Sequence, residues 1–310
     1  MNRDALSADR DGRRFDAKAS RAAQRFRLVS FLAVAPAFVS GCLTLTAEPR
    51  ALLQNDDGSV VVQSIRCGGE VARAAQAHAA SNAGLDPQAI RLVTWNLHKQ
   101  QDAGWQRDLT RFAVDRDIVL LQEIVLDPPL RGVIADAGLR WVMASSFLYE
   151  ARDIGVLTAA RTASLATCTQ RVVEPLLRLP KSAVITWFAL RDRSETLAVV
   201  NVHAVNFALS LGAYRAQFDA IVDALAEHRG PLVLAGDLNT WTDARSAVVK
   251  AAADRLGLAE IAFDDDRRRV FFGHQLDRIY VRGLEWGAAS ATPVTSSDHN
   301  PVAATLRVAH

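Results

Sequence analysis

The chain has 310 residues, 50% of them hydrophobic and 23% charged, and its formal net charge is +2 at pH 7. This length allows one domain of roughly 200–250 residues with a preceding segment, or two small domains. The small net charge, with no strong basic stripe, means that any anionic partner would be bound locally, at a site. The three cysteines form no CxxC motif or Cys/His cluster, which argues against a zinc site.

Residues 1–45 combine a basic segment, "RRFDAKASRAAQRFR", with an apolar one, "LVSFLAVAPAFVSGC", that ends at Cys42. This order is typical of a secretory signal, and "VSGC" resembles a bacterial lipobox, in which the cysteine is lipidated. An uncleaved membrane anchor stays open, because no charge falls between Arg27 and Glu48 and about 20 apolar residues can span a bilayer; so does a plain tail. We expect a protein of the cell envelope, tethered to the membrane through lipidated Cys42 or an anchor, with a cytoplasmic location as the alternative.

Residues 46–89 are expected to form a partly ordered linker with one short helix in "EVARAAQAHAASNAG", and residues 90–310 to form the folded domain. If Cys42 carries lipid, Cys67 and Cys168 are the two cysteines available for a disulfide. One disulfide between them suits an oxidising compartment. Two unrelated buried thiols are an equally good explanation, because the sequence does not define which cysteines pair.

From Arg91 onward, short apolar runs recur and many of them end in a polar residue. The runs are "RLVTWN", "DIVLLQE", "TLAVVNVHA", "PLVLAGDLN", "QLDRIYV" and "SDHNPVAATLRV". Apolar runs of about four to eight residues bounded by turn signals are typical of buried strands. The runs "AVITWFAL" and "TLAVVNVH" are separated only by the polar "RDRSE", which predicts a hairpin.

Helical patterns lie between these runs. Two sets of residues each share one helical face: Trp105, Leu109 and Phe112, and Tyr214, Phe218, Ile221 and Leu225. Asp243 has the position of an N-cap for "ARSAVVKAAADRL", a helix that ends at Gly257. Because strands and helices do not alternate strictly, the sequence predicts an α+β fold with antiparallel or mixed sheets covered by helices.

Eight polar residues stand at the ends of the predicted strands: Asn96, Glu123, His203, Asp237, Asn239, Asp277, Asp298 and His299. Loops beyond rigid strand ends can gather residues from distant segments, and hard oxygen ligands without thiolates suit Mg²⁺ or Mn²⁺. On an extended backbone Asp237 and Asn239 point to the same side, and Gly236 leaves room for close approach. The adjacent Asp298 and His299 should point in different directions.

Each of these residues also has a structural explanation of its own. Asn96 would satisfy a turn, and Glu123 would be a surface charge at a strand end. A lone His203 in an apolar run is more often a satisfied core residue, and Asp277 would pair with Arg278. Their common position at strand ends favours a functional site over these separate explanations.

The motifs "TWNLH", "LLQE", "NVHA", "GDLN", "LDRIYV" and "SDHNP" stand in the order found in one known group of proteins. The chain from Arg91 to Arg307 resembles the endonuclease/exonuclease/phosphatase superfamily, the DNase I-like metallohydrolases. "RLPKSAVIT", "VNVHAVNFALSLG" and "DDDRRRVFFGHQLDRIYVRGL" further resemble its YafD-like bacterial subgroup. The resemblance implies a four-layer α/β/β/α sandwich of two mixed, mostly antiparallel sheets flanked by helices, with the site at one end between the sheets.

The resemblance also implies roles for the strand-end residues. Asn96 and Glu123 would bind the divalent cation, Mg²⁺ or Mn²⁺, and Asp298 would complete that metal site. Five residues would carry the catalysis: His203, Asp237, Asn239, Asp277 and His299. Asp237 would orient or deprotonate the attacking water and Asn239 would hold a phosphate oxygen, while His203 would contact the phosphate or assist the leaving group. Asp277 would hydrogen-bond His299, which would contact the phosphate or transfer a proton.

The expected protein is therefore a monomeric, divalent-metal-dependent hydrolase of phosphate esters: a phosphodiesterase, endonuclease or phosphatase. A non-enzymatic, envelope-anchored binding protein is the alternative. The substrate stays open between nucleic acid and a phospholipid headgroup, although the compact domain and modest charge disfavour a dedicated DNA enzyme. His98 is interpreted as a local hydrogen-bonding residue. Arg178 and Lys181 are interpreted as phosphate contacts or as residues of an exposed loop. The charged run Asp264–Arg269 is interpreted as a solvated surface turn.

Overall fold

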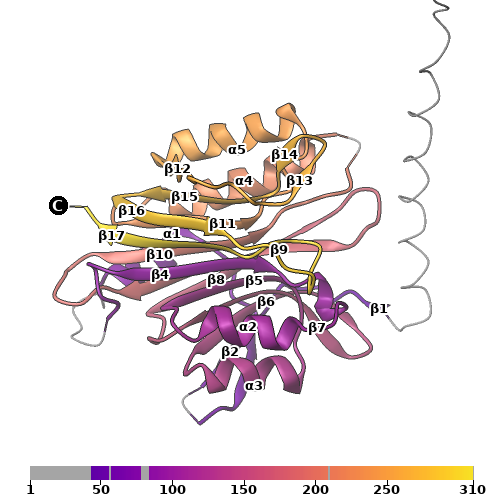
Figure 1. The fold of residues 1–310 in the computed structure, drawn as a ribbon, viewed down its shortest axis with the longest axis horizontal. Coiled ribbons are helices and arrows are strands. Elements are labelled where there is room, and N and C mark those ends of the chain that lie inside the picture. The colour runs from indigo at the N-terminus through magenta and orange to yellow at the C-terminus, as the bar shows by residue number, and fades with distance from the viewer. Residues whose placement is uncertain (1–42, 56, 78–83, 209, 310) are drawn as a thin grey trace, which may run out of the picture. The chain divides into compact units, whose positions relative to one another are not determined.

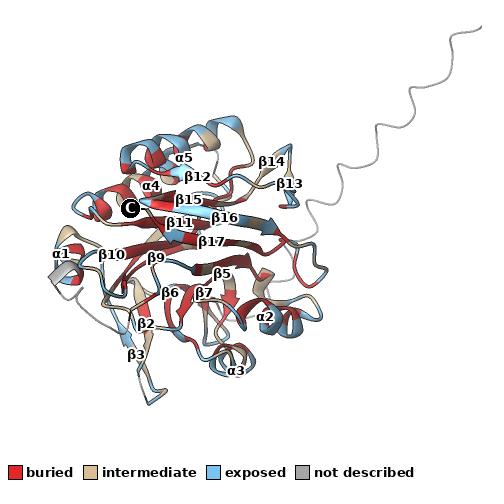
Figure 2. Cartoon of the chain, turned by 60° about the vertical axis from the view of Figure 1, so that its left-hand side comes forward, coloured by how far each residue is buried: buried red, intermediate tan, exposed pale blue. Residues whose placement is uncertain are grey.

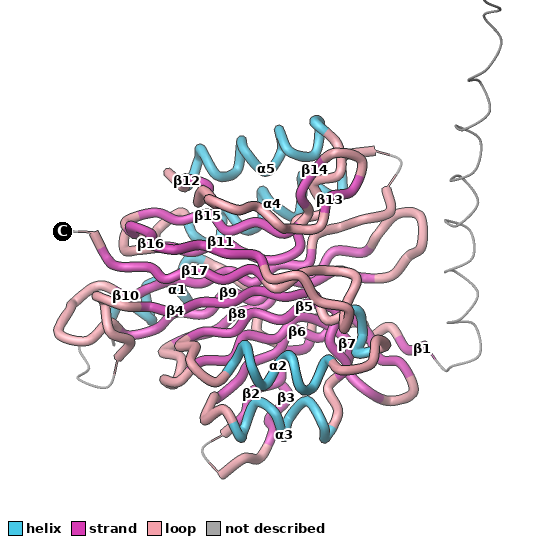
Figure 3. The backbone as a smooth tube through the Cα atoms, in the orientation of Figure 1, coloured by secondary structure: helices cyan, strands magenta, loops and turns pink. Residues whose placement is uncertain are grey.

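The computed structural model describes residues 43–309, except 56, 78–83 and 209. In this part of the chain two β-sheets pack face to face, and helices cover the outer face of each sheet (Figures 1 and 3). One sheet is covered by α1 (Gly69–Ala77), α4 (Gly212–Leu225) and α5 (Asp243–Leu256), and the other by α2 (Trp105–Ala113) and α3 (Pro128–Asp136). The arrangement confirms the predicted α+β class and the sandwich.

The larger sheet has nine strands, in the order β16-β17-β4-β5-β7-β6-β2-β3, with β1 paired to β6. Its strands are β1 (Leu43–Thr44), β2 (Arg50–Gln54), β3 (Val60–Gln63), β4 (Ile90–Asn96), β5 (Ile118–Val125), β6 (Arg140–Tyr149), β7 (Arg152–Ala160), β16 (Leu284–Ala291) and β17 (Val302–Val308). Only β4 and β5 are parallel among these pairs. Mixed pairing of this kind agrees with the predicted sheet type.

The smaller sheet has six strands, in the order β12-β15-β11-β10-β9-β8, and β10 and β11 are its parallel pair. Its strands are β8 (Ala166–Val173), β9 (Pro180–Ala189), β10 (Thr196–His203), β11 (Leu232–Asp237), β12 (Ala259–Glu260) and β15 (Asp277–Arg282). The predicted hairpin is β9–β10. A separate two-stranded hairpin, β13 (Val270–Phe271) and β14 (His274–Gln275), directly precedes β15.

Strand β10 shows why the central strands are apolar along their whole length. Leu197 and Val199 pack between the two sheets, whereas Ala198, Val200 and Val202 pack under the helices. Both faces are buried, as the red strands in the centre of Figure 2 show. Each of the buried leucine and valine side chains contributes about 1.5–3 kcal/mol through burial. The rigid centre of the sandwich then holds the strand ends in place.

Residues 46–89 are more regular than a linker. Ala51 and Leu52 of β2 are buried, β2 pairs with β6, and β3 pairs with β2. The expected short helix is α1, and a disulfide joins Cys67 beside it to Cys168 in β8. Strand β2 has five residues and strand β3 has four. Runs as short as "ALLQ" carry too little periodicity to separate a strand from a linker.

The helix ends agree with the sequence patterns, apart from one cap. Gly257 has a left-handed backbone after α5, as the pattern predicted. At the other end the N-cap is Thr242, whose side chain accepts from the backbone N–H of Arg245 at 3.2 Å, and Asp243 is the first helical residue. The basic and apolar segment that ends at Cys42 lies outside the described residues. Within the described ranges, no helix is long and apolar enough to cross a membrane.

The buried His228 predicts a pH dependence of stability. It lies beside Pro231, whose carbonyl is 2.9 Å from its Nε2, and burial lowers its pKa below the ordinary 6.5. Below pH 6.5, His228 is therefore protonated in the unfolded chain but stays neutral in the folded protein until a lower pH. Its contribution to the free energy of unfolding should be complete above pH 6.5 and should fall below it, by at most about 1.4 kcal/mol per pH unit. Urea titrations between pH 8 and 5 should show a smaller decline in the free energy of unfolding for His228→Gln than for the wild type. An equal decline in both proteins would contradict a contribution from His228.

Candidate active site

The polar strand ends meet at one end of the sandwich. His203, Asp237 and Asp277 are register partners across β10, β11 and β15, with Asp237 in the middle. Asn96 ends β4, and Glu123 lies near the end of the parallel strand β5. Because β15 runs antiparallel to β11, its first residue lies at the same end as the last residue of β11.

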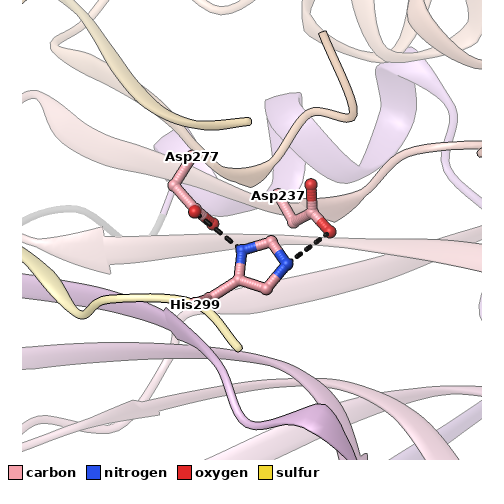
Figure 4. A group of neighbouring side chains, drawn as sticks. All are labelled: Asp237, Asp277 and His299. Atoms are coloured by element: carbon pink, nitrogen blue, oxygen red, sulfur yellow. Dashed lines mark hydrogen bonds and ion pairs between the residues drawn. The ribbon is translucent and has the colours of Figure 1, made fainter. Parts of the chain in front are cut away.

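His299 lies in the loop before β17, and Asp277 and Asp237 flank its ring (Figure 4). Its Nδ1 is 2.7 Å from Oδ2 of Asp277, and its Nε2 is 3.9 Å from Oδ2 of Asp237. All three side chains are buried. The 3.9 Å separation is too long for a hydrogen bond, so Nε2 and Asp237 can both act on a third group.

The loop that carries His299 is held to β4. The indole N–H of Trp95 donates to the carbonyl oxygen of His299 at 3.0 Å, and the hydroxyl of Ser297 donates to the carbonyl of Asn96 at 2.7 Å. The same Ser297 oxygen accepts from the backbone N–H of His299 at 3.1 Å. These bonds fix the backbone of the loop, and Asp277 then orients the imidazole.

The charges of this group follow from its burial. Burial alone would lower the pKa of His299, but the carboxylates of Asp277 and Asp237 outweigh it and raise the pKa to about 10. Burial raises the pKa of Asp237 to about 6, against the opposing charge of His299. At neutral pH the imidazole is thus a cation and Asp237 is mostly an anion. A charged acid and an ionised base stand side by side.

Glu123 is presented by an irregularity in β5. The pairing of β5 with β7 shifts register between Leu121 and Ile124, and Glu123 has a positive φ of 48°. A bulge of this kind redirects a side chain, and positive φ at a non-glycine residue is uncommon and concentrates at functional sites. The sequence predicted Glu123 at a strand end but not this distortion.

Two lysines face the Glu123 carboxylate. Lys99 is ion-paired with Oε2, and the Nζ of Lys181 is 3.5 Å from Oε1. Burial would raise the pKa of Glu123, but Lys99 and Lys181 hold it well below its ordinary range. A buried carboxylate that stays ionised is the kind of group that binds a divalent cation.

His203 lies between Glu123 and Asp237. Its Nε2 is 3.3 Å from Oε1 of Glu123, 3.5 Å from Oδ2 of Asp237 and 2.9 Å from Nζ of Lys181. Burial, and then the charge of Lys181, hold the pKa of His203 well below its ordinary range. The imidazole is therefore neutral, and its Nε2 accepts a hydrogen bond from the lysine.

The two asparagines hold Asp237. Asn96 donates from Nδ2 to Oδ2 at 3.0 Å, and the backbone N–H of Asn239 donates to Oδ1 at 3.0 Å. Asn239 has a positive φ of 50°, so the alternation of an extended strand does not apply there, and its Nδ2 donates to the carbonyl of Ala204. Gly236 serves the fold: a Cβ there would lie 2.1 Å from the carbonyl oxygen of Val202 in the neighbouring strand.

Asp298 lies at the edge of this group. Its side chain is 59% exposed, and the nearest imidazole is that of His98, with Nδ1 3.9 Å away. His98 itself contacts Asp102 at 2.8 Å, the local bond expected of it. Asp298 and His299 do point in different directions, as their adjacency predicted.

The described residues contain one Asp/His group with metal-ligand spacing: Asp237, Asp277 and His299, whose ligand atoms lie within 4.8 Å of one another. In that group Nδ1 of His299 is already bonded to Asp277, and its ring is charged. Glu123 offers an ionised carboxylate. Asn96 offers an amide oxygen, which accepts from the backbone N–H of His98 at 3.0 Å. Hard oxygen donors of this kind fit Mg²⁺ or Mn²⁺ better than the imidazole does.

Sequence reasoning missed two basic residues of the site, Lys99 and Arg268, and left a third, Lys181, open between a phosphate contact and an exposed loop. Lys99 lies in the short helix η2 (His98–Gln100), where three successive residues have positive φ. Lys181 was noted, but its reach to Glu123 depends on sheet register. Arg268 was expected in a solvated turn; it is buried, ion-paired with Glu260 and Asp266, and donates to the carbonyl of Asp277 at 3.1 Å. The charge run thus helps to position Asp277.

A two-sheet sandwich with these polar strand ends at one edge defines the DNase I-like class of folds. Residues 93–299 match the sequence model of the Endonuclease/Exonuclease/phosphatase family, and the chain belongs to this family. A UPF0294 protein of Klebsiella pneumoniae is 40% identical over 215 residues, which cover 69% of this chain and 81% of that protein. A UPF0294 protein of Vibrio parahaemolyticus is 33% identical over 282 residues, 90% of this chain and 96% of that one. These relatives confirm the YafD-like subgroup.

Solved structures share the fold at lower identity. The catalytic domain of human Nocturnin, with bound sulfate, superposes with a TM-score of 0.56 at 17% identity and covers 73% of this chain and 96% of that chain. TDP2 of D. rerio, complexed with a single-strand DNA product, has a TM-score of 0.52 at 14% identity and covers 71% of this chain and 99% of that chain. At this level of identity they support the shared fold only.

Proposed function

We propose that this protein is a divalent-metal-dependent hydrolase of phosphate esters. The observation that carries the proposal is the pair of oppositely charged groups, His299 and Asp237, that face each other across 3.9 Å beside the ionised Glu123. Membership of a family whose name covers nucleases and phosphatases supports it. A non-enzymatic binding protein would not need a buried acid and a buried base in opposite charge states.

A cation would be held by Glu123, and the amide oxygen of Asn96 would be its second protein ligand. When bound, it would offset negative charge on the phosphate oxygens. Mg²⁺ keeps several waters and takes one or two carboxylates together with substrate phosphate, so a single protein carboxylate is sufficient. The exposed Asp298 would contribute through water.

The protein's own residues would carry the proton transfers. Asp237 accepts a proton from the attacking water as its oxygen forms a bond to phosphorus. The bond from phosphorus to the leaving oxygen breaks, and His299 donates its proton from Nε2 to that oxygen. Asp277 keeps the imidazole charged until this transfer and oriented throughout. The Lys181 ammonium would neutralise phosphate oxygens, and the second N–H of the Asn239 amide, whose other N–H donates to Ala204, would hold one.

Bis-nitrophenyl phosphate with the full-length protein tests this function. We expect nitrophenol release in Mg²⁺ or Mn²⁺, its loss in EDTA, and its return when the metal is added in excess. Turnover that EDTA does not change would contradict metal dependence. No turnover of this ester, of nitrophenyl phosphate or of single-stranded DNA under any of these conditions would favour the binding protein.

We further propose that the N-terminal segment tethers the protein to the membrane of the cell envelope and that the protein acts as a monomer. The disulfide between Cys67 and Cys168 supports an oxidising compartment. Alkylation of the protein as isolated from cells, before any oxidation, followed by mass spectrometry tests this location. Free Cys67 and Cys168 thiols would favour the cytoplasmic alternative.

A further inference from the structure

Large apolar side chains are exposed on the loops that surround the catalytic residues. We call five of them the apolar rim: Leu176, Leu177, Phe207, Val270 and Phe272, which are between 43% and 74% exposed. They come from the β8–β9 loop, the loop after β10 and the β13–β14 hairpin. Exposed apolar residues gathered at one place on a soluble surface mark an interaction site.

Specific contacts join these loops. Oε1 of Glu174, in the β8–β9 loop, accepts from the backbone N–H groups of Asn206 and Phe207 at 2.6 and 3.2 Å. The indole N–H of Trp241, two residues after Asn239, donates to Oδ1 of Asn206 at 2.9 Å. The ring of Phe272 lies 6.4 Å from that of Trp241. The apolar rim is thus fixed to the same loops that follow His203 and Asp237.

A second set of features at this end indicates what covers the rim. Strand β1 pairs Leu43 with Tyr149 at the end of β6, on the side of the molecule that also carries β13 and β14 (Figure 1). In the sequence, the apolar run "LVSFLAVAPAFVSGC" immediately precedes this strand. Exposed arginines flank the rim residues, Arg178 next to Leu177 and Arg269 next to Val270. Apolar side chains with flanking arginines are the composition that binds the interface of an anionic bilayer.

We propose that this end of the sandwich is a membrane-docking face, on which the apolar rim enters the headgroup region of an anionic phospholipid bilayer. The substrate is then a phosphate ester carried by a membrane lipid, and this second part rests on the proposed hydrolase function. Leu176, Leu177 and Val270 favour a bilayer over single-stranded nucleic acid, because aliphatic side chains insert among lipids but offer no ring on which a base can stack.

Hydrogen exchange of the full-length protein tests the docking independently of activity. The protein is compared in detergent and on vesicles of equal parts phosphatidylcholine and phosphatidylglycerol. We expect amides of the β8–β9 loop and the β13–β14 turn to exchange about tenfold more slowly on vesicles, and those around Val114 to be unchanged. If flotation shows that the protein is on the vesicles but the rim amides exchange as fast there as in detergent, the proposal is overturned. Protection by a single-stranded oligonucleotide but not by vesicles overturns it in favour of nucleic acid.

Activity then tests the substrate class. The triple variant Leu176→Ser, Phe207→Ser, Phe272→Ser should lose at least about tenfold of its hydrolysis of vesicle phospholipid and keep its turnover of bis-nitrophenyl phosphate. Val62→Ser with Val114→Ser, which removes exposed apolar residues elsewhere, is the matched control and should lose neither. Equal losses on lipid and soluble ester overturn the substrate proposal. If vesicles slow exchange at the rim of a protein that cleaves no ester, docking is supported and the hydrolase function is contradicted. A failure of the docking proposal and a failure of the hydrolase function therefore give different results.

Discussion

Replacement of His299 by alanine is expected to lower turnover of a soluble phosphodiester by about 10³-fold, with little change in KM. The variant loses the charged donor that faces Asp237 across 3.9 Å, and it also loses the charge that keeps Asp237 ionised. Both the acid and the base of the proposed mechanism are then impaired. Steady-state kinetics with bis-nitrophenyl phosphate measure the loss.

Asp277→Asn separates positioning from chemistry in the same group. The ring of His299 stays, but the carboxylate that raises its pKa to about 10 is gone, so the pKa must fall. We expect about a 10²-fold loss of turnover, with the alkaline decline of the pH–rate profile moved to lower pH. His274→Ala, a histidine outside the group, is the control. An unchanged alkaline limb in Asp277→Asn would show that His299 is not the acid, and near-UV circular dichroism excludes unfolding as the cause.

The fold was predictable because its signals are local. Buried strands and amphipathic helices are each encoded within about ten residues. Asn96 and Asp237 lie in different sheets. They could be assigned to one site because each stands at the end of a predicted strand, within motifs that follow the order of the family. The strands of residues 46–89 escaped because their apolar runs are too short to show a period.

The missing parts of the site depend on non-local or strained geometry. Lys181 reaches Glu123 only through the packing of β9 against the larger sheet, and Lys99 only through a left-handed turn that no residue type announces. Arg268 looks like one of three solvated arginines, yet Glu260 and Asp266 compensate its charge in the interior. A charge pattern alone does not indicate which member of a run is buried.

Glu123→Gln should separate metal binding from the rest of the site. We expect Mg²⁺ affinity to fall by about 10²-fold and turnover by about 10³-fold, since the amide keeps the shape of the side chain but carries no charge. Calorimetric titration of Mg²⁺ measures the first effect without any substrate. Asp117→Asn removes another partly buried, ion-paired carboxylate, at the opposite end of β5 from Glu123, and should change neither quantity. Unchanged Mg²⁺ affinity in Glu123→Gln would move the metal site to the Asp237, Asp277 and His299 group.

Lys181→Met should affect the two quantities in opposite directions. The ammonium lies 3.5 Å from the Glu123 carboxylate, so it repels a cation bound there, and its removal should raise Mg²⁺ affinity. In the proposed mechanism the same ammonium neutralises a phosphate oxygen, so turnover should fall by about 10–100-fold even at saturating metal. A lysine that only balances Glu123 in the metal-free protein would give tighter metal binding with no loss of turnover. Opposite signs in calorimetry and kinetics therefore identify Lys181 as a group that acts on the substrate.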